Sequence, residues 1–295
     1  MLLMPFVLDL RYFVLLCCAR FARLACDVHP DFFSCYNSEN VMKKIKLGGK
    51  EVEIYDSIEE LPITRFHSYN KMLLVDAGIG SDLSDVDNHI SRAVGFMQDG
   101  KADMAERELD NLRQCIYFAQ SEISPRCMAF AALVKRIDGV EYNGVCTDSL
   151  KEVVEKLGGS KVGELFENLL TVKKKIDEEL TLYFPHEFED AKSKEYFDKL
   201  RQKALLTLDS VINDDEDDSK LKAITREVLT YFKPQVFEGT ESVEVQHDKQ
   251  FDKMCIALSK SLHIQPKKLT TLEFYNAFEY LKEQIKAEEK ALKRK

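Results

Sequence analysis

Residues 61–97 constrain the fold most strongly, because an apolar run, a glycine turn and a helical stripe follow one another there without a break. Residues 72–75 read Met-Leu-Leu-Val, and the glycines at 78 and 80 can adopt backbone angles that are closed to other residues. Ser81 or Ser84 can then cap a helix. Five apolar residues of that helix recur every three or four positions and share one face, which needs a partner: Leu83, Val86, Ile90, Val94 and Met97.

A second helix is predicted over residues 101–122, directly after a turn at Asp99-Gly100. Its apolar residues also form a single stripe: Ala105, Leu109, Leu112, Ile116 and Ala119. Because the connection is so short, the two helices are expected to run antiparallel.

The remaining sequence is also mostly helical in pattern, because prolines are few and segments rich in Lys, Glu, Leu and Ala are long. An apolar helix over residues 125–137 is expected to end at Asp138-Gly139, and Asn143-Gly144 could turn a small hairpin. Further helices are expected near residues 147–157, 160–182, 189–212 and 220–232, followed by two that Pro266 separates.

Strands are expected mainly at residues 43–54, where two alternating segments flank Gly48-Gly49. A four-residue loop would place Leu47 opposite Val52 and Ile45 opposite Ile54, with all four side chains on one face. The expected fold class is therefore mainly α, a helical bundle with a small N-terminal β-hairpin and minor extended pieces.

Residues 1–41 differ in composition from the rest of the chain. Apolar residues are dense there, but Pro5, Asp9 and Arg11 interrupt any membrane-spanning helix. Because Met42 opens a pattern typical of a natural protein start, residues 1–41 are interpreted as a non-native upstream extension or a loose apolar tail. The expected domains are an N-terminal hairpin plus helices over 42–212 and a C-terminal helical subdomain over 220–295. Like charges that repel one another predict an acidic linker at 213–219.

Charge and cysteine usage exclude several function classes. A formal net charge of -9 and an isoelectric point near 5.4 oppose binding to nucleic acid. The eight cysteines include no CxxC pair, which favours incidental thiols in a reducing, cytoplasmic compartment over a disulfide or zinc framework. Neither a nucleic acid nor a membrane is therefore an expected partner.

The best case for an enzyme is a group of carboxylates and imidazoles near the glycine turn, which could hold a divalent metal: His67, Asp76, Asp82, Asp85, Asp87 and His89. Three of these aspartates lie in the first turns of a helix, however, where acidic residues offset the positive end of the helix dipole. The lone histidines His186, His247 and His263 have no second ligand at a useful spacing and are interpreted as turn or cap residues.

Cys115 and Cys127 have no basic neighbour placed to activate a thiol. No catalytic, cofactor-binding or metal-binding residue is therefore assigned, no cofactor is expected, and the chain is expected not to be an enzyme. A metal-dependent enzyme centred on Asp76 to His89 is kept as an alternative, as is an intracellular helical regulatory module.

The last helix is expected to bind a partner protein. Thr270 and Glu273 form a capping box that defines where this helix begins. Its aromatic and apolar residues are more than one neighbouring helix can cover, and aromatic residues are enriched at interfaces. The residues expected to bind the partner are Phe274, Tyr275, Phe278, Tyr280 and Leu281. The alternative is that the last two helices close the core of the chain itself.

Three segments resemble proteins from the structural modules of tailed bacteriophages and prophages. Residues 42–54, MKKIKLGGKEVEI, are similar to the opening of tail assembly chaperones, as is LVKRIDGVEY at 133–142 with the helix DSLKEVVEKLGG that follows. Residues 251–286 resemble the two closing helices of such assembly factors. The resemblance implies a non-enzymatic role in virion or tail assembly, with other phage proteins as partners and homo-oligomerisation left open.

The central segment LPITRFHSYNKMLLVDAGIGSDLSD at residues 61–85 departs from the pattern of the tail assembly chaperones, because it has no counterpart in them. This departure leaves open a different virion or accessory role within the same class of phage proteins.

Overall fold

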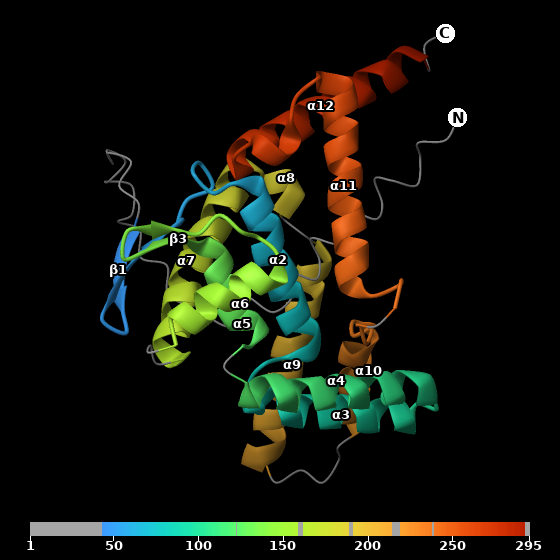
Figure 1. The fold of residues 1–295 in the computed structure, drawn as a ribbon. Coiled ribbons are helices and arrows are strands. Elements are labelled where there is room, and N and C mark those ends of the chain that lie inside the picture. The colour runs from blue at the N-terminus through green and yellow to red at the C-terminus, as the bar shows by residue number, and fades with distance from the viewer. Residues whose placement is uncertain are drawn as a thin grey trace. The chain divides into compact units, whose positions relative to one another are not determined.

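The computed structural model describes residues 43–292, except residues 122, 159–161, 189–190, 214–218 and 238. Helices make up most of this part of the chain, and the strands form one antiparallel sheet in the order β1-β2-β3-β4 (Figure 1). The predicted fold class, mainly α with a small N-terminal β-hairpin, is confirmed. The predicted extension at 1–41 and nearly all of the predicted acidic linker at 213–219 lie outside the described residues.

The chain divides into two compact units, and each is built from segments that are distant in sequence. The sheet unit contains residues 43–75, 121–184 and 237–292, and the helical unit contains residues 76–120 and 185–236. The elements of the sheet unit are β1 (Lys43–Leu47), β2 (Lys50–Ile54), most of α2 (Ile63–Ile79), α5 (Pro125–Leu133), β3 (Val134–Ile137), β4 (Val140–Glu141), α6 (Thr147–Lys156), α7 (Val162–Tyr183), α11 (Val243–Leu262), the short 3-10 helix η3 (Pro266–Lys268) and α12 (Thr271–Leu292).

The helical unit begins with the last turn of α2 and then forms a helical hairpin and a second helix pair. Its further elements are the 3-10 helix η2 (Leu83–Asp85), α3 (Val86–Gln98), α4 (Ala102–Gln120), the short α8 (Pro185–Phe188), α9 (Ala191–Asn213) and α10 (Ser219–Thr230). In the second pair, Tyr196 of α9 packs 5.6 Å from the ring of Tyr231, and Lys199 lies 2.6 Å from Glu227 of α10.

The first hairpin has the predicted strands but a different register. Its loop contains only Gly48 and Gly49, both with positive φ, so that Leu47 lies opposite Lys50 and Ile45 opposite Val52. The predicted four-residue loop is therefore wrong. Since the register differs by two residues, the apolar side chains still share one face of the sheet.

Two predictions between residues 125 and 145 are also wrong. The helix expected to reach Ile137 ends at Leu133, and Val134–Ile137 is a strand that pairs with β2. The following turn is at Asp138 and Gly139, both with positive φ, and not at Asn143-Gly144. Pairing with β2 places this segment inside the sheet and buries Val134 and Ile137, and this burial outweighs the helical pattern that continues from α5.

Arg65 joins α2 to the sheet. Its guanidinium is almost fully buried and donates hydrogen bonds to the carbonyls of Ala132 (3.1 Å) and Val134 (2.7 Å), where α5 turns into β3. It also donates to the carbonyl of Tyr142 and lies over the ring of Tyr55. These bonds satisfy the backbone groups that a helix-to-strand transition leaves without partners.

The C-terminal helices are part of the sheet unit. Ile63 donates a backbone hydrogen bond to Leu269 (3.0 Å), and Thr271 donates one to Leu61 (2.8 Å). The chain therefore differs from the predicted division, in which residues 220–295 form a subdomain of their own. The start of α12 completes the backbone hydrogen bonding around Pro62. The order of the segments in sequence does not predict this contact, because the two segments are distant in the chain.

Candidate functional site

Two of the aspartates predicted as an alternative metal site, Asp76 and Asp82, form hydrogen bonds within the turn. Asp82 accepts a hydrogen bond from the backbone N–H of Ser84 at the start of η2, and Asp76 accepts one from the hydroxyl of Ser81. His89 is buried and turned toward Glu108 and the carbonyl of Ile79. Within the described residues, the one group with the spacing of metal ligands is His67, His247 and Asp248, which includes none of these aspartates.

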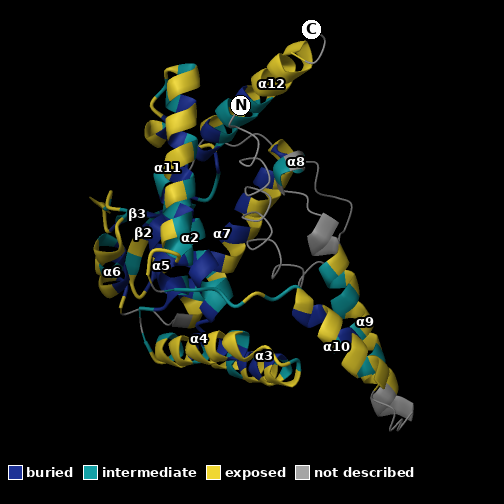
Figure 2. Cartoon of the chain, turned by 90° about the vertical axis from the view of Figure 1, so that its right-hand side faces the viewer, coloured by how far each residue is buried: buried dark blue, intermediate teal, exposed yellow. Residues whose placement is uncertain are grey.

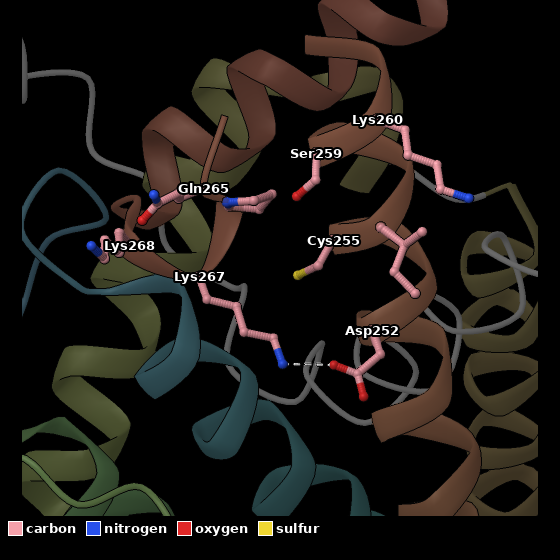
Figure 3. A pocket seen from close by; sticks show the side chains of 9 residues that line it. Asp252, Cys255, Ser259, Lys260, Gln265, Lys267 and Lys268 are labelled. Atoms are coloured by element: carbon pink, nitrogen blue, oxygen red, sulfur yellow. Dashed lines mark hydrogen bonds and ion pairs between the residues drawn. The ribbon is translucent and has the colours of Figure 1, made fainter. Parts of the chain in front are cut away.

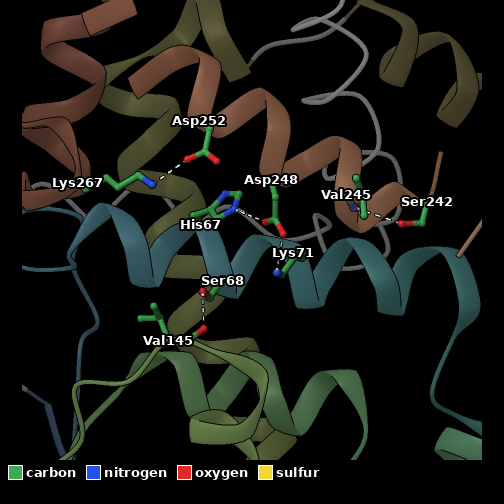
Figure 4. A network of polar contacts seen from close by, with 9 residues as sticks. All are labelled: His67, Ser68, Lys71, Val145, Ser242, Val245, Asp248, Asp252 and Lys267. Carbon is green, nitrogen blue, oxygen red and sulfur yellow. Dashed lines mark hydrogen bonds and ion pairs between the residues drawn. The ribbon is translucent and has the colours of Figure 1, made fainter. Parts of the chain in front are cut away.

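The group around His67 is formed between α2 and α11 (Figure 4). Nε2 of His67 lies 2.8 Å from a carboxylate oxygen of Asp248, and the ammonium of Lys71 lies 3.2 Å from the other oxygen. The ring of His67 is stacked between those of His247, 4.2 Å away, and Phe251, 4.1 Å away. The prediction that His247 is a turn or cap residue is therefore wrong, because it lies buried inside α11.

Burial keeps both imidazoles of this group neutral. It lowers the pKa of His247 from 6.5 to about 2, and the charge of Lys71, and of His67 when that ring is protonated, acts in the same direction. Burial also lowers the pKa of His67, against the opposing effect of the Asp248 carboxylate. The two stacked rings therefore behave as an apolar contact at neutral pH, with Asp248 and Lys71 as the charged pair at its edge.

This arrangement does not fit a metal ion. The rings of His67 and His247 are stacked with their planes only 21° apart and their centres 4.2 Å apart. The nitrogen lone pairs of the two rings therefore lie in nearly parallel planes and cannot meet at one ion about 2.1 Å from each nitrogen. Nε2 of His67 and both carboxylate oxygens of Asp248 are also already engaged. Ser68, which follows His67 in α2, donates to the carbonyl of Val145 and points away from the imidazoles (Figure 4).

A shallow pocket of about 560 Å³ lies between α11 and η3 (Figure 3). Cys255 and Ser259 line one side, and Gln265 and Lys267 line the other. Lys267 forms an ion pair of 2.8 Å with Asp252, and burial raises the pKa of the Cys255 thiol. The raised pKa keeps this thiol protonated and unreactive at neutral pH.

The α3–α4 hairpin shows the most unusual distribution of side chains. Its interior contains a polar network in which Glu108 of α4 contacts Nδ1 of His89 at 2.8 Å and also the guanidinium of Arg92. His89 is fully buried, and Glu108 and Asn111 nearly so. Burial alone would raise the pKa of Glu108, but the hydrogen bond from His89 and the charge of Arg92 lower it.

The predicted apolar stripes of α3 and α4 lie outside the hairpin. Five of their large side chains are between 39% and 65% exposed, and Figure 2 shows long exposed stretches on both helices: Ile90, Val94, Met97, Leu109 and Ile116. Leu112 is half-buried. The expectation that the face containing Val94 needs a partner stands, but the other helix of the hairpin does not fill that role.

Both stripes face the same side of the hairpin. In α3 the exposed residues Ile90, Val94 and Met97 each directly follow a buried one, and the same holds for Leu109, Leu112 and Ile116 in α4. One residue is a rotation of about 100° around a helix. Since α3 and α4 run antiparallel, an equal rotation in the same sense points both stripes to one side. We call these six residues the α3–α4 face.

Another side of the hairpin is covered by α10 and the segment that follows it. A methyl carbon of Leu229 lies directly against Gly95, and the guanidinium of Arg92 lies 5.0 Å from the centre of the Phe232 ring. Arg226 forms an ion pair of 3.6 Å with Asp99 at the turn. The described helices of the helical unit therefore leave the α3–α4 face exposed.

The residues predicted to bind a partner on α12 are only partly available. Phe274 and Leu281 are buried, and Phe274 packs 5.9 Å from Phe251. Tyr275 packs 5.4 Å from Phe184. For these three residues the alternative holds, because the helix pair closes the core of the sheet unit. Two others remain accessible, with Phe278 half-buried and Tyr280 exposed.

No protein family, curated protein or solved structure matches this chain. Among the helices in the described part of the chain, none is both long enough and apolar enough to cross a membrane. The four cysteines within the described ranges, at 115, 127, 146 and 255, are reduced thiols.

Proposed function

We propose that this chain is a non-enzymatic assembly factor of a tailed bacteriophage or prophage, which holds a virion or tail protein through direct contacts. The observation that supports this proposal is the α3–α4 face, where apolar side chains are exposed while His89, Glu108 and Asn111 are buried. A helix that folded for its own stability alone would have the opposite arrangement.

Covering this face contributes favourable free energy to binding a partner. Its five exposed members are each roughly half accessible, so that covering them contributes on the order of 5 kcal/mol. A partner helix with apolar residues at the corresponding spacing would bind in the manner of a helix in a groove. The resemblance to tail assembly chaperones supports a phage structural protein as the owner of that helix.

Complementation tests this function. The gene is deleted from the phage or prophage genome that encodes it, and infectious particles are counted after complementation with wild type or with the double variant Val94→Glu, Met97→Glu. We expect deletion to abolish particle formation, and the double variant to fail to restore it, because two charges on the α3–α4 face oppose burial.

The matched control is Leu205→Glu, Leu208→Glu on α9, where the two leucines are similarly exposed. It adds the same charge within the same unit and should restore particles. Both variants should melt within a few degrees of wild type, because surface substitutions usually change stability by less than about 0.5 kcal/mol. Normal particle yield after deletion of the gene would refute the proposed function.

A further inference from the structure

We infer that the occupant of the α3–α4 face is a single amphipathic helix with basic flanks that belongs to another protein. This inference rests on the proposed function and adds the chemistry of the partner. Two antiparallel helices whose apolar stripes point to one side form one apolar surface, and one further helix lying along it can touch both stripes. The length of this surface is limited by α3, whose 13 residues span about 20 Å.

The charged residues around the α3–α4 face indicate which kind of helix would complement it. Residues 82–120 contain eight Asp and Glu against four Lys and Arg, a formal net charge of -4, and the α3–α4 face itself contains none of them. Asp87 flanks the stripe on α3, and Glu106 and Asp110 flank the stripe on α4. Arg113 lies on that edge of α4 as well and forms an ion pair of 2.9 Å with Asp110, so Asp87 and Glu106 carry the net negative charge of this border. A helix with Lys or Arg beside its apolar residues would complement this border.

A second copy of this chain fits less well. Two copies meeting through the α3–α4 face would bring two acidic borders together, each from a hairpin of net charge -4 within a chain of net charge -9. Opposed like charges raise the free energy of association and select against such a pairing. The acidic border therefore favours a basic partner and disfavours self-association.

Two synthetic peptides of about 14 residues, a length of about 20 Å when helical, serve as probes. Both carry Leu at helical spacing, and their polar positions are Lys in one peptide and Glu in the other. Binding to the full-length chain is measured by fluorescence anisotropy. We expect the Lys peptide to bind at least tenfold more tightly than the Glu peptide, and this preference to shrink as salt rises from about 50 mM to about 500 mM.

Two variants assign the binding to this surface. Val94→Glu, Met97→Glu should abolish binding of the Lys peptide, and Glu106→Gln, Asp110→Asn should weaken it several-fold. The matched control Glu283→Gln, Glu288→Gln removes the same number of charges from the exposed end of α12 and should leave binding unchanged. Equal binding of the two peptides, or no binding of the Lys peptide, would overturn the inference.

Sedimentation velocity tests whether a second copy of this chain binds the α3–α4 face. A dimer that Val94→Glu, Met97→Glu dissociates would overturn the inference in favour of a second copy, whereas a monomer supports it. Failure of the basic partner is distinguishable from failure of the proposed function. In the first case the peptide preference is absent while deletion of the gene still abolishes particles, and in the second case the deletion has no effect.

Discussion

His247 should make the stability of the sheet unit depend on pH. Its pKa is about 2 in the folded chain and 6.5 when the imidazole is not buried, as in the unfolded chain. Between these two pH values the unfolded chain binds a proton that the folded chain does not bind. The contribution is fully present above about pH 6.5 and is lost as the pH falls, by about 1.4 kcal/mol per pH unit. His247→Phe keeps the ring stacked on His67 and removes the titration.

Urea unfolding at pH 7.5 and at about pH 4.5 measures this effect. We expect wild type to lose about 3 kcal/mol more than His247→Phe over this interval, because two pH units separate 4.5 from 6.5. The control is His263→Asn, since His263 is exposed at the end of α11 in a left-handed conformation that Asn tolerates. Equal pH dependence in wild type and His247→Phe would show that the buried imidazole is protonated in the folded chain.

Glu108 should be the residue on which the α3–α4 hairpin depends most. It is buried between His89 and Arg92, so Glu108→Gln leaves the guanidinium without its compensating carboxylate. Removal of one partner of a buried ion pair costs about 3 kcal/mol. Glu106→Gln, two residues earlier and exposed, should cost less than about 0.5 kcal/mol, and equal melting temperatures for the two variants would contradict the buried network.

At the scale of the element, the start of α12 is set by the predicted capping box, which is confirmed. Thr270 donates its backbone N–H to Glu273 at 2.9 Å, and Glu273 donates its own to the Thr270 hydroxyl at 3.3 Å. Thr270→Ala should cost about 1 kcal/mol in the urea unfolding of the sheet unit. Thr181→Ala, at an exposed position of α7, should have no cost, because Ala is the better helix former.

The existence and type of most elements could be predicted from the sequence, because apolar periodicity and turn residues act locally. β3 could not, since Val134 and Ile137 become strand only through pairing with β2, about 80 residues earlier in the chain. The orientation of α3 and α4 was also missed. Periodicity identifies the apolar stripe, whereas the buried side is decided by the bonds among His89, Arg92 and Glu108.

The groups around His67 illustrate the same limit for sites. His67 and Asp248 lie 181 residues apart, and no spacing rule connects them. The adjacent residues His247 and Asp248 are the only sequence feature that indicates this group. An imidazole and a carboxylate that are neighbours in one helical turn can both contact one residue of another helix, as they contact His67 here. The α3–α4 face, in contrast, was present in the sequence as two stripes, and only its exposure had to come from the structure.

At the scale of the whole molecule, the sheet unit should need its C-terminal helix. Deletion of residues 267–295 removes Phe274 and the backbone bonds that Thr271 and Leu272 make to Leu61 and Ile58. We expect the thermal transition of the sheet unit to be lost. Deletion of residues 284–295, whose described members are all exposed, should leave the transition in place. A retained transition in the longer deletion would show that α12 is an appendage.

The backbone hydrogen bond between Ile63 and Leu269 also affects how the chain folds during its synthesis on the ribosome. Synthesis proceeds at about 5–20 residues per second, so α2 emerges roughly 10–40 s before the segment that completes its N-terminal end. Throughout that interval the apolar side chains Phe66 and Tyr69 lack Tyr275 and its neighbours, and they are open to other nascent chains. A chain whose synthesis stops before residue 269 would therefore lack the segment that completes the core of the sheet unit.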